Sequence, residues 1–121
     1  MTNKVTLSSP LGVKQKLFTK LIAQLILYAY DIGEELSFGD AYRDPRVHGE
    51  VGVKKSYSSA NSVHKHRLAV DLNLTTGGTY KASTEDHRRL GEYWESLHPL
   101  CRWGGRFNDG NHYSFEHQGV K

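Results

Sequence analysis

The residues best suited to chemistry lie in two short polar stretches, residues 62–71 and 109–117. A catalytic zinc uses three protein ligands, drawn from His nitrogens and carboxylate oxygens, and leaves a fourth position for water. His64, Asp71 and His112 could supply that set. Asp109 is the nearest carboxylate that could take a proton from the water. The pattern predicts a metal site, with a plain surface cluster of polar residues as the alternative.

The spacing of the first two candidate ligands constrains the chain between them. His64 and Asp71 are seven residues apart, which is an odd number. On one straight strand they would therefore point to opposite faces of the sheet. We expect a bend between them, with His64 at the end of a loop and Asp71 on a strand.

Two helices are predicted to support these stretches. Residues 14–30 carry an apolar stripe at helical spacing. Ser9 before Pro10 is a candidate cap, with the proline at the first helical position, and Gly33 is a candidate stop. A second helix is expected from a capping box at residues 83–86 to about residue 98. The first stripe consists of Leu17, Phe18, Leu21, Ile22, Leu25 and Ile26, and the second of Leu90, Trp94 and Leu97.

Alternating apolar and polar residues predict three strands. They cover residues 35–42, residues 67–74 and about residues 111–116. Residues 45–61 are polar, contain glycine and show no period, so they are expected to form a long loop of a kind that often carries function.

Composition narrows the class of protein. The 121 residues fit a single domain, 1–121, without a wall-binding module, and the net charge is only +3. The one cysteine, Cys101, excludes an internal disulfide and a four-cysteine zinc site. Neither a secretory signal nor a membrane span is expected. No nucleic-acid partner is expected either, because no reading helix or aromatic platform is recognisable.

Three motifs together resemble the LAS-type zinc peptidases, the group of D-Ala-D-Ala carboxypeptidases and L-alanyl-D-glutamate endopeptidases. The resemblance runs from about residue 17 to residue 113 and is greatest to the small phage endolysins. The motifs are Ala41-Tyr42-Arg43, then Ser62-x-His64 followed by Ala69-x-Asp71, and finally Trp103-Gly104-Gly105 with Asp109-x-x-His112-Tyr113.

The resemblance implies a role for each matched residue. His64, Asp71 and His112 would hold one Zn²⁺, and Asp109 would be the general base. Ser62 and Arg43 would bind substrate or stabilise the oxyanion. The implied fold is a small α+β domain, in which helices pack on one face of a short antiparallel sheet and a zinc cleft lies on the other.

Several residues depart from that pattern or have other interpretations. Many relatives have glycine where Arg67 stands, and Ser-Phe-Glu-His follows Tyr113 here. Glu116 is therefore an alternative base and His117 an alternative ligand, while His66 is a weaker candidate that could instead face solvent. The remaining expectations place Trp103 and Phe107 in the core or a cleft wall, Cys101 in the core, and His87 and His98 on the surface.

The expected function is zinc-dependent cleavage of the L-alanyl-D-glutamate bond in peptidoglycan stem peptides, as by an endolysin. The alternatives are a D-alanyl-D-alanine carboxypeptidase of the same fold and a non-catalytic envelope-binding module. We expect a monomer that is made in the host cytoplasm without a signal peptide. It would act on the cell wall in the periplasm after a membrane-permeabilising protein gives it access.

Overall fold

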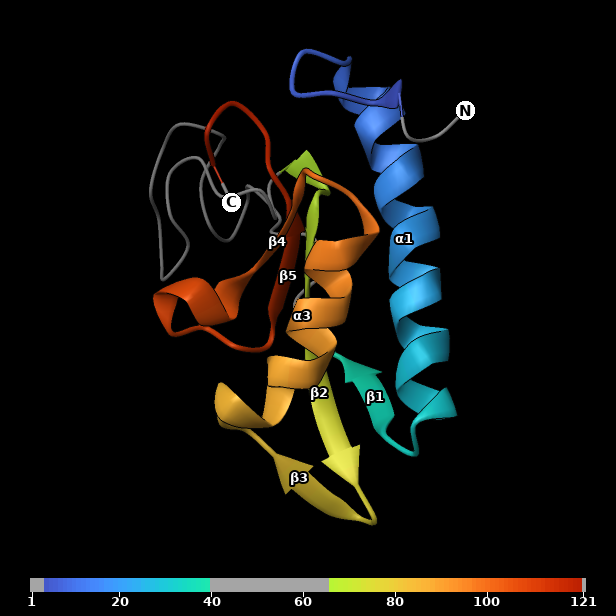
Figure 1. The fold of residues 1–121 in the computed structure, drawn as a ribbon, viewed down its shortest axis with the longest axis vertical. Coiled ribbons are helices and arrows are strands. Elements are labelled where there is room, and N and C mark those ends of the chain that lie inside the picture. The colour runs from blue at the N-terminus through green and yellow to red at the C-terminus, as the bar shows by residue number, and fades with distance from the viewer. Residues whose placement is uncertain (1–3, 40–65, 121) are drawn as a thin grey trace.

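The fold is described from a computed structural model, for residues 4–39 and 66–120. Within these residues, two α-helices, five strands and two 3-10 helices follow one another along the chain (Figure 1). In order they are α1 (Leu11–Asp31), β1 (Glu35–Phe38), β2 (Ala69–Thr76), β3 (Thr79–Lys81), η3 (Glu85–His87), α3 (Arg88–Leu97), β4 (Cys101–Trp103), η4 (Gly104–Phe107) and β5 (His112–Phe115).

The five strands form one open sheet in which every pairing is antiparallel. The strand order is β1-β2-β5-β4, and β3 pairs with β2 beyond this path. The long strand β2 therefore runs through the middle and contacts three others. Its partner β5 comes from the far end of the chain, so the two polar stretches of the sequence meet on adjacent strands.

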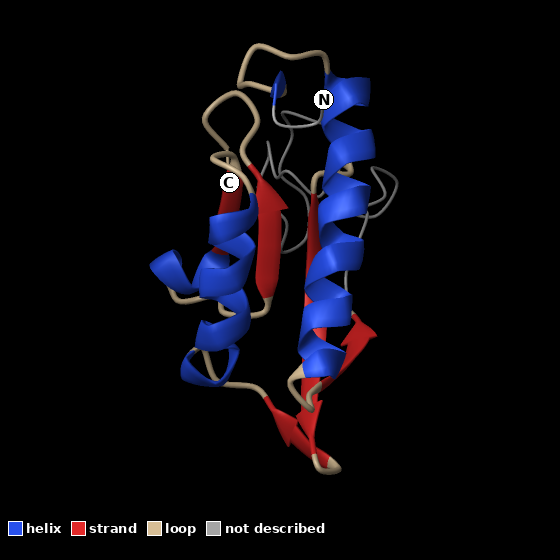
Figure 2. Ribbon diagram, turned by 45° about the vertical axis from the view of Figure 1, so that its right-hand side comes forward, coloured by secondary structure: helices blue, strands red, loops and turns tan. Residues whose placement is uncertain are grey.

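Both helices pack against the same face of this sheet (Figure 2). From α3, the ring of Trp94 meets Tyr113 of β5 edge to face, with 6.4 Å between centroids. From α1, Phe18 contacts both Trp94 and Phe115. The α+β class, with helices on one face of an antiparallel sheet, is thus confirmed. The zinc cleft expected on the opposite face stays a prediction.

The first helix follows its predicted stripe. Five of its predicted apolar positions are buried, and Ile26 packs at the edge of the core. Gly33, just after the helix, has φ +87°, a conformation that favours glycine, so the predicted stop is confirmed. The predicted start is wrong by one position, because Pro10 is the cap and the Ser9 hydroxyl accepts from the Thr6 N–H at 2.9 Å instead. The five buried positions are Leu17, Phe18, Leu21, Ile22 and Leu25.

The capping box and the central strand are also confirmed. The Ser83 hydroxyl accepts from the Asp86 N–H at 3.1 Å, and the Asp86 carboxylate accepts from the Ser83 N–H at 3.3 Å. One turn of 3-10 helix separates this box from α3. Strand β2 alternates as expected but continues to Thr76, two residues beyond the predicted end of the strand.

Two strands were not predicted. β3 and β4 have three residues each, which is too short for alternation to be recognised. The turn before β3 is a two-residue hairpin, in which Gly77 and Gly78 both have positive φ.

The expectation that His87 and His98 lie on the surface is wrong. They are only 1% and 6% exposed. His87 Nδ1 lies 2.8 Å from the Tyr113 hydroxyl, and His98 Nδ1 accepts from the Leu100 N–H. Burial lowers the pKa of His87, against the opposing charge of Asp86, and burial also lowers the pKa of His98.

These lowered pKa values predict acid destabilisation. The folded protein keeps both histidines neutral, so the unfolded chain binds more protons as the pH falls below about 6.5. We expect stability to be full above that pH and the melting temperature to drop between pH 7.5 and pH 5.5, with chelator present. In His87→Gln the drop should be smaller. Equal stability at both pH values would contradict the prediction.

A second stability prediction concerns Arg67, just before β2. Its φ is +59°, in the left-handed region where a side chain costs about 1 kcal/mol relative to glycine. We compare Arg67→Gly with Arg67→Ala, because both remove the same side-chain interactions. Arg67→Gly should be more stable by about 1 kcal/mol in denaturant unfolding. Equal stability of the two variants would show that the backbone does not hold this conformation.

Neither helix in residues 4–39 and 66–120 combines the length and the apolar character that crossing a membrane requires.

Candidate functional site

Asp71 and His112 come together on the sheet. They are cross-strand partners in the register of β2 and β5, and His112 Nδ1 lies 3.4 Å from Asp71 Oδ1. Both side chains are largely buried, at 7% exposure for His112 and 16% for Asp71. Two residues 41 positions apart in the sequence therefore present a nitrogen and an oxygen to the same small volume.

Because side chains alternate along a strand, Asp71 and His112 point away from the helices. Val70 and Tyr113, the neighbouring cross-strand pair, point into the core on the helix side. Asp71 and His112 consequently project from the other face. The backbone of Asp71 is further fixed, because its carbonyl accepts from the Gly39 N–H at 2.7 Å.

The chain turns at Arg67, before β2 begins. This turn lies between the two candidate ligands in the sequence, while the predicted position of His64 lies outside the described residues.

Asp109 lies on the segment that leads into β5. Its N–H donates to the Gly104 carbonyl at 2.8 Å, and its own carbonyl accepts from the His112 N–H at 3.1 Å. Gly104 is required here, because a Cβ would lie 2.1 Å from the Asp109 carbonyl oxygen and 2.7 Å from His112 Cβ. The backbone of Asp109 is thus tied directly to His112, while its side chain is exposed.

Two aromatic residues flank this segment as the sequence predicted. Trp103 is 1% exposed and belongs to the core. Phe107 is half-exposed, and its ring meets the His112 ring with 5.7 Å between centroids. Phe107 therefore forms a wall beside the pair.

Glu116 comes directly after the last residue of β5. Its Oε1 pairs with Arg102 Nη2 at 2.6 Å, and this ion pair is mostly buried. A carboxylate held by a guanidinium in this way is suited to staying ionised and fixed rather than to moving a proton. The placement favours Asp109 over Glu116 as the base.

His66 and His117 form a separate cluster with Lys14. The two rings lie 4.8 Å apart, and the fully buried Lys14 ammonium donates to the Leu7 carbonyl at 2.6 Å and lies 3.1 Å from His117 Nδ1. Burial, Lys14 and His66 lower the pKa of His117, and burial lowers the pKa of His66. A cationic neighbour makes this a poor place for a metal ion.

Lys14 is a residue that the sequence analysis missed. It lies one turn before Leu17 and Phe18, on the buried stripe of α1. Lys14 comes three residues before Leu17 and four before Phe18, and this helical spacing could have indicated that it lies on the buried stripe. Burial lowers the pKa of its ammonium, and the charge of Glu116 opposes that shift.

Three predicted site residues, Arg43, Ser62 and His64, lie outside the described residues. Within residues 4–39 and 66–120, no group of three or more His, Cys, Asp and Glu is placed to hold a metal ion. That range contains only two of the three predicted ligands, Asp71 and His112.

The donor set and its spacing fit zinc. Two ligand atoms about 2.1 Å from a tetrahedral zinc lie about 3.4 Å from each other. The separation of His112 Nδ1 and Asp71 Oδ1 has this value. An imidazole nitrogen and a carboxylate oxygen are also the ligand types found at catalytic zinc sites.

No protein-family model matches the chain, and no curated protein matches it.

Proposed function

We propose that this protein is a zinc-dependent peptidoglycan peptidase that cleaves the L-alanyl-D-glutamate bond of stem peptides, as an endolysin does. The observation that carries the proposal is the His112 and Asp71 pair, whose nitrogen and oxygen lie 3.4 Å apart on the face of the sheet opposite the helices. The pair belongs to two of the three motifs on which the family resemblance rests, and the third ligand, His64, precedes Asp71 in one of them.

Each residue has a defined task in this proposal. His64, Asp71 and His112 would hold the metal, which when bound would supply a water with a pKa lowered towards about 7 and a charge that polarises the scissile carbonyl. Asp109, on the segment tied to His112, accepts the proton from the attacking water and returns it to the leaving amine. Ser62 and Arg43 position the peptide, with the guanidinium binding a carboxylate or the developing oxyanion.

The described contacts argue against a cysteine nucleophile. Cys101, the chain's single cysteine, is buried in the core, and burial raises the pKa of its thiol. A nucleophilic cysteine needs the opposite, an accessible thiol with a lowered pKa. The reaction class proposed, metal-assisted hydrolysis, needs no such nucleophile.

The proposed setting is the bacterial cell wall. The protein acts there as a monomer, after a membrane-permeabilising protein gives it access to the periplasm. Its substrate is the stem peptide of peptidoglycan.

Lysis of outer-membrane-stripped cells tests the proposal. The wild-type protein should clear a suspension of such cells, and His64→Ala should fail to do so while keeping its circular dichroism spectrum and one cooperative melting transition. Glu92→Gln, a substitution on the exposed surface of α3, serves as the control and should lyse normally. Retained lysis by His64→Ala would refute the ligand assignment.

The masses of the released products decide which bond is cut. Whole peptides that begin at D-glutamate support the proposed endopeptidase. Loss of single alanines would identify a D-alanyl-D-alanine carboxypeptidase instead. Binding to sacculi without any new amino group would identify a non-catalytic envelope-binding module.

A further inference from the structure

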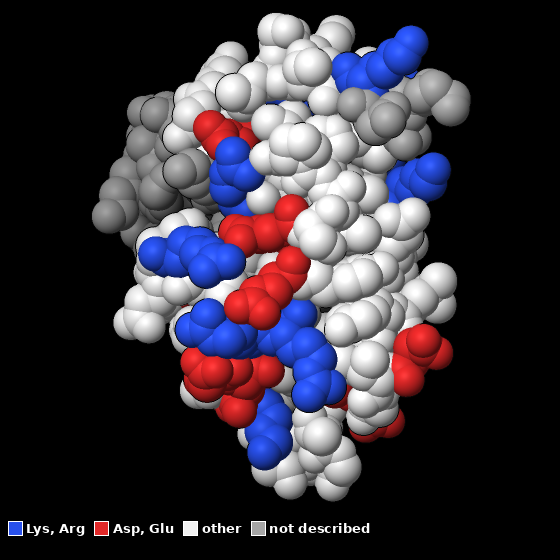
Figure 3. All heavy atoms as spheres, viewed as in Figure 1, with Lys and Arg blue, Asp and Glu red and all other residues white. Residues whose placement is uncertain are grey.

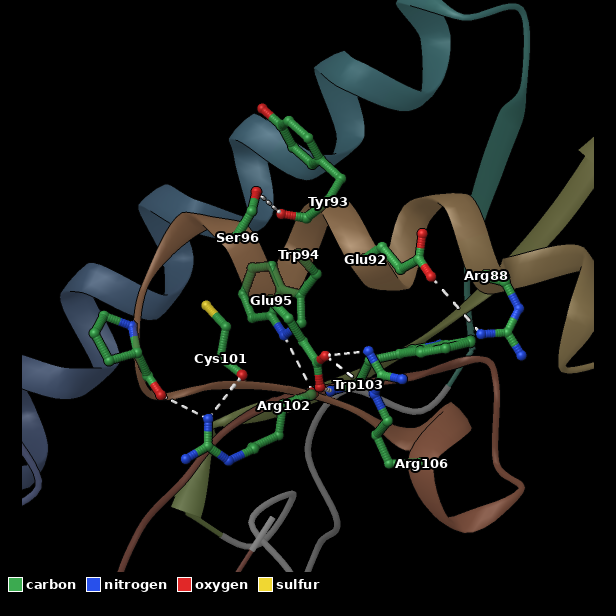
Figure 4. A network of polar contacts seen from close by, with 11 residues as sticks. Arg88, Glu92, Tyr93, Trp94, Glu95, Ser96, Cys101, Arg102, Trp103 and Arg106 are labelled. Atoms are coloured by element: carbon green, nitrogen blue, oxygen red, sulfur yellow. Dashed lines mark hydrogen bonds and ion pairs between the residues drawn. The ribbon is translucent and has the colours of Figure 1, made fainter.

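The carboxylate of Glu95, on α3, connects that helix to the segment that carries Asp109. Glu95 Oε2 accepts from the Trp103 backbone N–H at 3.1 Å. Glu95 Oε1 accepts from Arg106 Nε at 3.1 Å and Nη2 at 2.7 Å. The Glu95 side chain thus holds both Trp103, where this segment starts, and Arg106, in its first turn, as Figure 4 shows.

The Trp103 side chain adds a second attachment to the same segment. Its indole N–H donates to the Gly110 carbonyl at 2.7 Å, so the ring bridges across residues 104–110. Gly91 and Gly105 lie against the ring so closely that a Cβ on either would come within 2.4 Å of it. The Arg106 guanidinium lies 5.5 Å from the ring centroid, within cation-π range.

The segment held in this way sets the position of Asp109. Between its two anchors, the Asp109 N–H donates to Gly104, and the Asp109 carbonyl accepts from His112. Asn108, just before Asp109, ends the turn of residues 104–107 with φ +63°, a left-handed conformation that asparagine adopts readily.

The negative charge of the Glu95 carboxylate strengthens the hydrogen bonds that it accepts from Trp103 and Arg106. Burial opposes the charged form, but the hydrogen bonds from Arg106 and Trp103 outweigh it, so the pKa of Glu95 lies below its usual range. The carboxylate is therefore ionised at neutral pH and accepts both contacts at full strength.

We propose that Glu95 is a positioning residue, which fixes the segment of residues 104–110 so that Asp109 is held beside His112. This inference rests on the proposed function, because it assigns Glu95 a part in placing the general base. Glu95 does not touch substrate or metal in this account. It acts through Trp103 and Arg106.

The neighbouring charges on α3 supply a matched control. Figure 3 shows basic and acidic side chains alternating on the face of the molecule where α3 lies. Glu92 pairs with Arg88 at 3.7 Å, both on α3, whereas Glu95 pairs with Arg106 outside the helix. Glu92→Gln therefore makes the same chemical change one turn earlier and removes no hydrogen bond to Trp103 or Arg106, only the smallest of the charge interactions that act on Arg106.

Amide hydrogen exchange and steady-state kinetics of Glu95→Ala and Glu95→Gln test the proposal. We expect exchange of the Asp109 and His112 amides to accelerate by at least about tenfold in Glu95→Ala. The Phe115 amide, which donates to the Leu68 carbonyl in the core, should be unchanged. We expect kcat to fall by about 10- to 100-fold, with KM and zinc content retained, because a misplacement of about 1 Å has effects of this size.

The glutamine variant keeps one acceptor oxygen and should show a smaller effect of the same kind. It also provides the test if Glu95→Ala fails to fold. Glu92→Gln should match the wild type in both measurements.

Three results would overturn the inference. They are unchanged exchange at Asp109 and His112, equal acceleration at Phe115, which indicates a general loss of stability, and equal kcat in the Glu95 and Glu92 variants. Failure of the proposed function is distinguishable from these, because it removes the activity of the wild type. The exchange data then still decide whether Glu95 fixes the segment.

Discussion

Asp71→Ala is expected to abolish zinc binding and peptidase activity while the protein stays folded. The side chain supplies one of three ligands, and its oxygen lies 3.4 Å from the nitrogen of His112. Removing residues that only orient a ligand lowers metal affinity by about 10- to 100-fold, so removing a ligand should lower it by more than about 100-fold. Zinc per chain after dialysis and the rate of peptide release measure the two effects.

Asn73→Ala is the matched control for this variant. Asn73 lies two residues further along β2, so its side chain projects from the same face of the same strand. It should bind one zinc and retain activity. A zinc content in Asp71→Ala equal to that of the wild type would remove Asp71 from the ligand set.

The second large effect is expected for Asp109→Asn. An amide cannot accept the proton of the attacking water, so kcat should fall by about 10²- to 10⁴-fold. Zinc content should be unchanged, because Asp109 is not a ligand in this account. Stability should change by less than about 0.5 kcal/mol, since the side chain is exposed.

Glu116→Gln provides the comparison that decides between the two candidate bases. Glu116 forms a mostly buried ion pair with Arg102, so its substitution should lower the melting temperature and affect kcat much less than Asp109→Asn. The reverse order, with the larger loss of kcat in Glu116→Gln, would identify Glu116 as the base.

The elements predicted correctly are those with a long and regular pattern. The stripe of α1 extends over several turns, and the alternation of β2 covers most of its eight residues. The capping box at Ser83 and the stop at Gly33 also follow from local chemistry, because each depends on residues that are near in sequence. From these elements alone the α+β class could be predicted.

The elements that were missed depend on contacts between distant residues. β4 has three residues, and it becomes a strand only by pairing with β5. His87 is buried because Tyr113, 26 residues later, offers its hydroxyl. Neither partner can be identified from local periodicity, so no strand was predicted in one case and a surface residue was predicted in the other.

For the candidate site, the sequence predicted that Asp71 and His112 lie together but not how they meet. The residue types and the motif resemblance identified Asp71 and His112, but their direct pairing is a matter of strand register. The same holds for Glu116, which the sequence offered as a base and which the fold places against Arg102. The role of Glu95 could not be predicted at all, since its partners lie 8 and 11 residues away on other elements.

The most direct test of this account is mass spectrometry of the soluble products formed when the purified protein is incubated with peptidoglycan, with and without chelator. The account predicts peptides that begin at D-glutamate, their loss with chelator, and their return when zinc is added. The absence of any chelator-sensitive product on accessible peptidoglycan would contradict it.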